Sequence, residues 1–287
     1  SPSLSVSIST LMSSNSGPVE RNLVVRINES YSHLFDALSG NLIVSCQASK
    51  GEPLCKPEHI LALSLSALNG GARALRLEGV ENIAFVRQAV DALYKVHLPI
   101  VGLTKADIAE DQKLTTSYIT ATFADARALA DAGADIIALD ATGRRRLDDM
   151  TLAETIERIH TDLHKPVWAD CATFAEGEAA AACGADIVST TLFGYTAETA
   201  LPPEHGPGLE LLRQFVDRLD VPVILEGRVW HPEEITEAFT IGAFAVVVGS
   251  AITRPQLITE RFVKAIPAHL KTKNAGALGS ASKANSK

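Results

Sequence analysis

Short apolar runs recur along the chain and are separated by segments long enough to form helices. Some of these runs follow a Gly-Ala pair, where glycine suits the left-handed residue that ends a helix. Others begin at a proline, which removes no essential hydrogen-bond donor at the first position of a strand. Each run is nearly continuous in apolar residues, as is typical of parallel strands buried on both faces. The runs predict eight strands, which begin near Asn41, Ala72, Pro99, Asp135, Pro166, Asp186, Pro222 and Phe244.

The segments between these runs carry signals for the start of a helix. Three prolines suit the first helical turn, where a backbone N–H is not needed: Pro57, Pro232 and Pro255. A threonine and a carboxylate have capping-box spacing at Thr122/Asp125, Thr151/Glu154 and Thr173/Glu176. Eight strands alternating with helices predict an α/β protein, a single-domain (β/α)8 or TIM barrel. A doubly wound open sheet is the alternative, but such sheets usually have fewer strands, and no GxGxxG or GxxxxGKS/T loop is present.

Composition indicates where the barrel begins and ends along the chain, and it excludes several classes of protein. The barrel is expected over residues 31–270, between a Ser-rich N-terminal extension (1–30) and a low-complexity tail (271–287) that are both expected to be disordered. The formal charge of -8 argues against a nucleic-acid or anionic-membrane surface. No run approaches the ~20 apolar residues that span a bilayer, and the first residues lack the apolar segment of a secretory signal. A cytoplasmic protein is expected.

Two residues at strand ends are candidates for catalysis, because the C-terminal ends of the strands form the active-site rim of a barrel. Lys105 follows the run IVGLT, where burial and neighbouring cations would lower its pKa and make it a base or a Schiff-base amine. The alternative is a lysine with its ammonium in solvent. Glu226 ends the run VPVILE, where desolvation would raise its pKa into the range of an acid at neutral pH. The alternative is a structural salt bridge with Arg228.

Other polar residues on the predicted rim are candidates for binding. Gln47 and Arg76 could hold sugar hydroxyls, an amide or a carboxylate, although Arg76 could also form an ion pair at the barrel end. Asp140 and Asp170 are either substrate contacts or helix caps. The same rim contains three further candidates for substrate binding, Thr173, Tyr195 and Arg228.

The segment VVVGSAITRP predicts a phosphate site. A strand leads into Gly249 and Ser250, and a helix begins after Arg254, so that backbone N–H groups and a helix N-terminus converge. Barrel enzymes frequently bind phosphate with the loops after strands 7 and 8, and Gly227 supplies a compatible turn after strand 7. The histidines are scattered without HxH or HxxxH spacing, so no metal site is expected.

These segments together resemble the N-acetylmannosamine-6-phosphate 2-epimerases of sialic acid catabolism. The matching stretches are LIVSCQA, GGARALRLEG, PIVGLTK, YIT, AGADIIALDATGRRR, STTLFGYT, VILEGRV and GAFAVVVGSAITRP, which together span the folded body in the family's order. The resemblance implies a cofactor-independent, commonly dimeric barrel that acts on a phosphorylated N-acetyl amino sugar.

The resemblance also implies roles for particular residues. Lys105 and Glu226 match the family's catalytic lysine and glutamate, and Gln47, Arg76 and Asp170 match substrate contacts. Asp140 lies in its Asp-Ala-Thr motif, and the phosphate end is matched by Gly249, Ser250 and Arg254.

Two other functions remain open on the residues alone. Lys105 could form a Schiff base in a phosphosugar aldolase or synthase, which borohydride reduction would trap. The protein could also be a non-catalytic phosphosugar sensor, which would bind its ligand without exchanging a proton.

Overall fold

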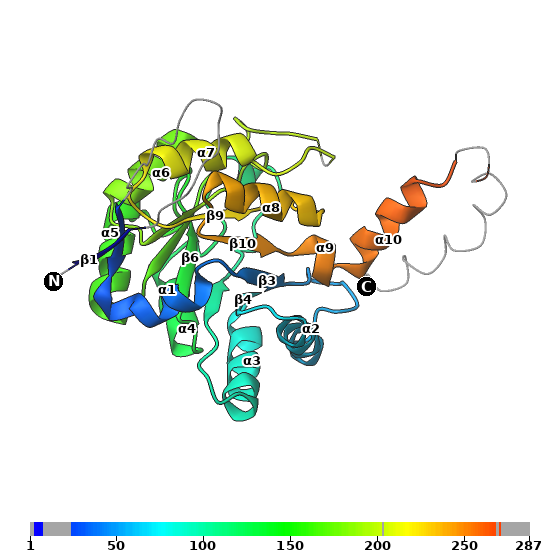
Figure 1. The fold of residues 1–287 in the computed structure, drawn as a ribbon, viewed down its shortest axis with the longest axis horizontal. Coiled ribbons are helices and arrows are strands. Elements are labelled where there is room, and N and C mark those ends of the chain that lie inside the picture. The colour runs from blue at the N-terminus through cyan, green and yellow to red at the C-terminus, as the bar shows by residue number, and fades with distance from the viewer. Residues whose placement is uncertain (1–2, 8–23, 203, 268–269, 271–287) are drawn as a thin grey trace.

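The protein is described by a computed structural model that covers residues 3–7, 24–202, 204–267 and 270. Its centre is a closed barrel of eight parallel strands in the order β10-β3-β4-β5-β6-β7-β8-β9 (Figure 1). The strands are β3 (Leu42–Cys46), β4 (Ala74–Glu78), β5 (Ile100–Leu103), β6 (Ile136–Asp140), β7 (Val167–Asp170), β8 (Ile187–Ser189), β9 (Val223–Glu226) and β10 (Ala245–Val248). Each begins one or two residues after its predicted start. The predicted (β/α)8 barrel is confirmed.

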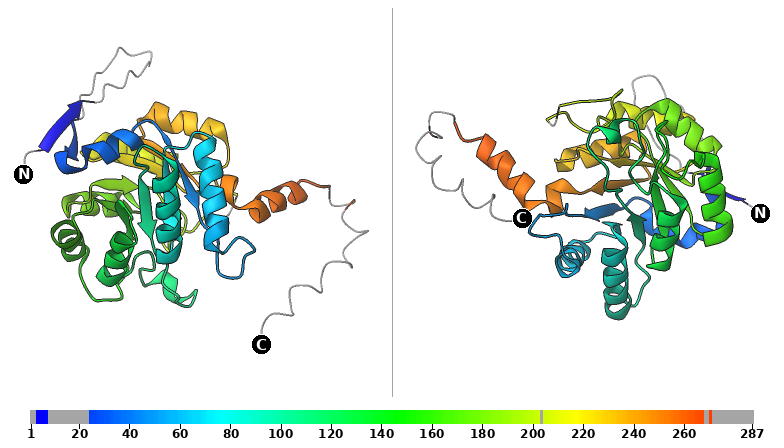
Figure 2. Two further views of the ribbon diagram at one scale, coloured as in Figure 1. Left: turned by 90° about the horizontal axis from the view of Figure 1, so that it is seen from below. Right: turned by 180° about the vertical axis from the view of Figure 1, so that it is seen from behind.

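Helices connect the strands and surround the barrel (Figure 2). They are α2 (Pro57–Asn69), α3 (Val80–Leu93), α4 (Phe123–Asp131), α5 (Leu152–Arg158), α6 (Phe174–Ala182), α7 (Leu209–Arg218), α8 (Pro232–Ile241), α9 (Ser250–Thr253) and α10 (Pro255–Lys264). The three predicted prolines begin α2, α8 and α10, and the three predicted capping boxes form at the starts of α4, α5 and α6. A π-helical turn, η3 (Ile159–Leu163), extends α5.

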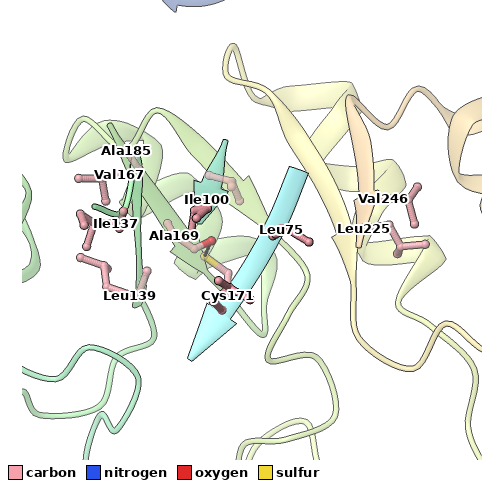
Figure 3. Close-up of a cluster of buried hydrophobic side chains, with 14 of the residues drawn as sticks. Leu75, Ile100, Ile137, Leu139, Val167, Ala169, Cys171, Ala185, Leu225 and Val246 are labelled. Atoms are coloured by element: carbon pink, nitrogen blue, oxygen red, sulfur yellow. Dashed lines mark hydrogen bonds between the residues drawn. The ribbon is translucent and has the colours of Figure 1, made fainter. Parts of the chain in front are cut away.

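Alternation along the strands separates two apolar layers. Leu75, Ala169 and Leu225 belong to the larger cluster, which packs the outer surface of the strands against the helices (Figure 3). Ala74 and Trp168 belong to a second cluster, which fills the interior of the barrel. Because successive side chains of a strand point to opposite faces, the last inward position of most strands falls on a polar residue. The interior of the barrel is therefore apolar along most of its length and polar at the C-terminal ends of the strands.

The N-terminal end of the barrel is closed by α1 (Ser32–Leu38), which directly precedes the first barrel strand. Its Leu34, Phe35 and Leu38 are buried and join the interior cluster. The ring of Phe35 lies 6.2 Å from that of Phe244, at the start of the last barrel strand. The cavity described below therefore opens at the opposite end.

The expected boundary of the disordered extension at residue 30 is wrong for residues 24–30. Val24–Asn28 form strand β2, which pairs antiparallel with β1 (Ser3–Ser7), and residues 29–31 form a 3-10 turn, η1. The cause is contact with the barrel: Ile27 is buried in the interior cluster, and the backbone N–H of Arg26 donates to the carbonyl of Asp220 at 2.7 Å. Residues 1–2 and 8–23 of the extension and the tail 271–287 lie outside the described residues.

Helix α10 differs from the helices before it. It projects away from the barrel in every view (Figures 1 and 2), and none of its residues is buried. Within the described part of the chain, no helix combines the length and the apolar character needed to cross a bilayer.

Candidate active site at the C-terminal rim

A cavity of about 990 Å³ opens at the C-terminal ends of the strands. Ten of the residues predicted for the site line it: Gln47, Arg76, Lys105, Tyr195, Glu226, Gly227, Arg228, Gly249, Ser250 and Arg254. They come from strand ends and loops far apart in the sequence, which the closure of the barrel brings to one rim. The volume suits a small ligand.

A buried ion triad forms the floor of the cavity. Alternation along the strands directs Arg76, Asp170 and Glu226 inward. Nη2 of Arg76 donates to Oδ2 of Asp170 at 2.7 Å, and its Nε lies 3.0 Å from Oε1 of Glu226. The latter is an ion-pair contact in which the N–H is not aligned with the oxygen, and Nη1 has no partner among the described residues. The Arg76 side chain is 1% exposed and stacks on Trp168 at 5.2 Å. Arg76 therefore has a donor to offer a ligand.

Glu226 has the properties of an acid at neutral pH. Desolvation by burial raises its pKa to about 7, and the nearby charge of Asp170 acts in the same direction. The charges of Arg76 and Lys105 and a hydrogen bond from Thr191 oppose this rise. Because the pKa lies near neutrality, both protonation states are populated where proton transfer needs them.

Lys105 lies on the same cavity and has the opposite shift. The side chain is accessible through the open cavity but has protein atoms on most sides, and this desolvation lowers its pKa. The charges of Arg76 and Arg254 lower it further, whereas Glu78 and Glu226 oppose the shift. Its Nζ donates to Oε1 of Gln47 at 2.7 Å. The lowered pKa increases the neutral, basic form of the amine.

The predicted phosphate residues gather at the junction of β9, β10 and β3. Gly227 has φ +97, and a Cβ there would lie 3.2 Å from the carbonyl oxygen of Thr191. Gly249 approaches Ser45 closely enough that a Cβ would lie 3.2 Å from the serine Cβ. Arg254 forms an ion pair with Glu52, a residue of the loop after β3 that the sequence did not reveal. The two glycines thus allow the turns after β9 and β10 to pack closely against Thr191 and Ser45, and Arg254 places a positive charge beside these turns.

Three residues predicted to bind substrate do not line this cavity. Asp140 is buried and already accepts hydrogen bonds from the backbone and hydroxyl of Thr142 and from Nη2 of Arg144. Asp170 is fully buried within the floor, where it pairs with Arg76. Thr173 caps α6 through Glu176. The polar atoms of these three residues are used within the protein, and their role in substrate binding stays a prediction.

Arg228 lines the cavity but does not pair with Glu226, which was the alternative role for both residues. Its guanidinium donates to the carbonyls of Pro202 at 2.7 Å, Gly194 at 3.0 Å and Leu201 at 3.1 Å. It also stacks on the Tyr195 ring at 4.6 Å. The first role of Arg228 is therefore to hold the long loop after β8 against the cavity.

Sequence reasoning missed other residues of the site. Tyr118 lines the cavity from the long segment between β5 and α4. It begins the YIT stretch of the family resemblance, but the sequence did not identify it as a site residue. Thr191 also belongs to the site, because its hydroxyl contacts Glu226. Glu78 is the last residue of β4, and its interaction with Lys105 depends on the three-dimensional placement of the segment after β5. In the described part of the chain, no three His, Cys, Asp or Glu side chains gather as a metal site would require.

Thr173→Ala tests the structural assignment of this residue. Loss of the N-cap is expected to lower the free energy of unfolding by about 1 kcal/mol and to leave KM unchanged, because the hydroxyl accepts from the Glu176 backbone. Denaturant unfolding and steady-state kinetics measure the two effects. Thr151→Ala removes an equivalent cap on α5 and is the matched control. A clear rise in KM at unchanged stability would return Thr173 to the substrate site.

The closed barrel and its rim define a (β/α)8-barrel enzyme equipped for proton transfer, because one cavity joins a lysine of lowered pKa to a carboxyl of raised pKa. A family model described as "Putative N-acetylmannosamine-6-phosphate epimerase" matches residues 60–268. The chain belongs to this family of N-acetylmannosamine-6-phosphate epimerases.

Individual relatives agree with this assignment. A protein of Thermosynechococcus vestitus is 45% identical over 237 residues, which are 83% of this chain and 98% of the relative. One of Cutibacterium acnes is 42% identical over 232 residues, covering 80% and 95% respectively. Both are named "Putative N-acetylmannosamine-6-phosphate 2-epimerase". The solved N-acetylmannosamine-6-phosphate 2-epimerase from Clostridium perfringens is 38% identical, with a TM-score of 0.74 over 81% of this chain and 96% of that one.

Proposed function

We propose that this protein interconverts N-acetylmannosamine 6-phosphate and N-acetylglucosamine 6-phosphate, a reaction of sialic acid catabolism. The observation that carries the proposal is the presence of Lys105 and Glu226 on one cavity with pKa values shifted in opposite directions. Inverting C2 requires a base on one face and an acid on the other. In the ring-opened sugar, C2 lies next to an aldehyde, which makes its proton removable.

The proposed mechanism uses both residues. Neutral Lys105 removes the C2 proton of one epimer, and the electron pair moves into an enediolate whose oxygen needs hydrogen-bond donors. Protonated Glu226 returns a proton to the opposite face of C2. Lys105 is then an ammonium and Glu226 a carboxylate, and exchange with cavity water restores the starting charges. In the other direction the two residues exchange roles.

The remaining lining residues fit the rest of the substrate. The unpartnered Nη1 of Arg76 and the amide of Gln47 can donate to sugar oxygens near the reacting carbon. The glycine turns and Arg254 lie at the side of the cavity formed by β9 and β10, where a phosphate would bind. Phosphate binding there would hold C2 between the acid and the base, which uses remote binding energy to position the reacting carbon.

The decisive experiment is a proton spectrum of N-acetylmannosamine 6-phosphate incubated with the enzyme in heavy water. Epimerisation by proton transfer predicts deuterium at C2 together with the gluco epimer. A Schiff-base aldolase or synthase predicts a borohydride-trapped adduct on Lys105 instead. A sensor predicts ligand binding with no exchange. Absence of both exchange and epimer would overturn the proposal.

A homodimer is also proposed, on the basis of helix α10. In a (β/α)8 barrel the helices pack on the strands, but α10 buries none of its residues on its own chain. Phe262 is 74% exposed, and Val263 and Ile266 are also exposed. In a two-fold dimer the same exposed apolar surface of a second copy would cover α10, and the interface would be closed.

Phe262→Asp is expected to shift the protein from dimer to monomer, because an interface core does not accommodate an unpaired charge. Sedimentation equilibrium gives the mass directly. The control is Phe85→Asp, which changes another exposed phenylalanine, on α3, and is expected to stay dimeric. A monomeric wild-type protein, or a dimeric Phe262→Asp variant, would contradict this role for α10.

A further inference from the structure

A hydroxyl network around the carboxylates of the cavity floor contains more acceptors than protons. Thr191 Oγ1 lies 2.8 Å from Oδ1 of Asp170, 3.0 Å from Oε2 of Glu226 and 2.7 Å from Oγ of Ser189. The indole N–H of Trp168 donates to the same Ser189 oxygen at 2.9 Å. Since an indole nitrogen can only donate, the Ser189 hydroxyl must give its own proton to another oxygen.

The single proton of Thr191 cannot serve both carboxylates at once. It can be donated to Asp170 or to Glu226, and Ser189 can satisfy Asp170 from 3.1 Å when Thr191 does not. The backbone of Glu226 is held separately, because the Thr190 hydroxyl donates to its carbonyl and accepts from its N–H. The direction of the Thr191 hydrogen bond can therefore change while the heavy atoms stay in place.

We propose that Thr191 is a positioning residue whose hydroxyl reverses its hydrogen bond to Glu226 each time that carboxyl gains or loses a proton. When Glu226 is a carboxylate, Thr191 donates to it and Ser189 donates to Asp170. When Glu226 is protonated, its O–H donates to Thr191 Oγ1, and Thr191 donates to Asp170. Ser189 keeps its own hydrogen bond to Asp170, whose oxygen accepts both. Every proton has an acceptor in both states, and neither state leaves a buried donor unpaired.

The charged groups around Glu226 cannot supply this adjustment. Arg76 from β4 remains a cation, and its guanidinium is fixed by Asp170 from β7 and by the Trp168 ring. Lys105, at the end of β5, faces Glu226 only through the cavity. The Thr191 hydroxyl can make the adjustment, because its hydrogen turns toward whichever oxygen accepts it while the heavy atoms stay in place. The inference rests on the proposed acid–base role of Glu226 and adds the residue that makes both of its forms stable.

The test is the titration of Glu226 in the free enzyme. It is monitored by carbon NMR of protein labelled at the glutamate carboxyl carbons. Glu226→Gln identifies the signal. Thr191→Val keeps the shape of the side chain but removes the hydroxyl that donates to the carboxylate. Its titration midpoint is expected to rise by about one pH unit, because a hydrogen bond to the charged form is lost. Thr191→Ser keeps the hydroxyl and is expected to restore the wild-type midpoint.

Two further variants complete the test. Thr191→Ala is a second hydroxyl-free variant with the same expected shift, should the valine variant fail to fold. Thr155→Val removes a hydroxyl on the buried Thr155 of α5, which donates to the Thr151 carbonyl and does not line the cavity, and is expected to leave the midpoint unchanged. An unchanged midpoint without the Thr191 hydroxyl, or a serine variant that behaves like valine, would overturn the inference.

Activity distinguishes this inference from the proposed function. In the hydroxyl-free variants, the limb of the kcat/KM pH profile that reports Glu226 is expected to move to higher pH in parallel with its titration. This is the low-pH limb in the direction in which Glu226 is the base, and the high-pH limb in the direction in which it is the acid. If wild-type protein shows no exchange at C2 but the titration shifts as expected, the epimerase proposal fails and the hydrogen-bond reversal is upheld. If exchange occurs and the midpoint does not move, the role of Thr191 is wrong and the epimerase proposal stands.

Discussion

Lys105→Met is expected to slow epimerisation by about 10²–10⁴-fold, the contribution typical of a positioned general base. Methionine has similar length and keeps the apolar part of the side chain, but it cannot accept the C2 proton. Steady-state turnover and deuterium uptake at C2 measure the loss. The barrel is expected to stay intact, because the polar contact of this amine is with Gln47 in the cavity.

Lys50→Met is the matched control for this experiment. Lys50 and its partner Asp107 are both almost fully exposed, at 94% each, so the control is expected to turn over like the wild-type enzyme. Turnover of Lys105→Met close to wild type would remove Lys105 from the mechanism. Loss of turnover with a folded-state circular dichroism spectrum supports its role.

Arg76→Leu is expected to lower the free energy of unfolding by about 3–5 kcal/mol at neutral pH. The substitution leaves the Asp170 carboxylate without its buried cation, and Glu226 loses the charge that opposes its protonation. Denaturant unfolding measures the change. The predicted loss of stability is large because the Asp170 carboxylate would stay buried without a positive charge beside it.

Arg145→Leu provides the comparison on the surface. Arg145 pairs with Asp149, and both side chains are about 70% exposed, so its loss is expected to cost less than about 1 kcal/mol. Similar costs for the two substitutions would show that the triad at the cavity floor does not depend on its buried cation.

The fold could be predicted from sequence because its signals are local. A Gly-Ala pair ends a helix and a proline begins a strand whatever the rest of the chain does, so the strand starts were correct within two residues. Ten of the predicted residues line one cavity, since barrel closure brings the strand ends together on one rim. The N-terminal boundary was wrong because the burial of Ile27 depends on the lower end of the barrel, which local patterns do not reveal.

The predicted residues that do not line the cavity have one feature in common: their polar atoms have partners within the protein. A polar residue after a strand can face the cavity or be satisfied within the protein, and the sequence does not tell these outcomes apart. Asp140 is used by Thr142 and Arg144 in its own loop, whereas Asp170 is used by Arg76, 94 residues away. The Glu52 contact of Arg254 spans an even longer separation. Such pairings depend on which side chains meet when the barrel closes.

The proposed phosphate end lies where the first and last strands of the barrel meet, so ligand binding there depends on closure of the ring. β10 pairs with β3, with Val246 opposite Leu42, so the first and last strands complete the ring. Gly249 packs on Ser45 across this seam, and the hydroxyl of Thr253 donates to the Ser45 carbonyl at 2.7 Å. A nascent chain that stops before residue 245 therefore has no complete binding site. Ligand binding would select finished barrels, and its free energy would add to that of ring closure.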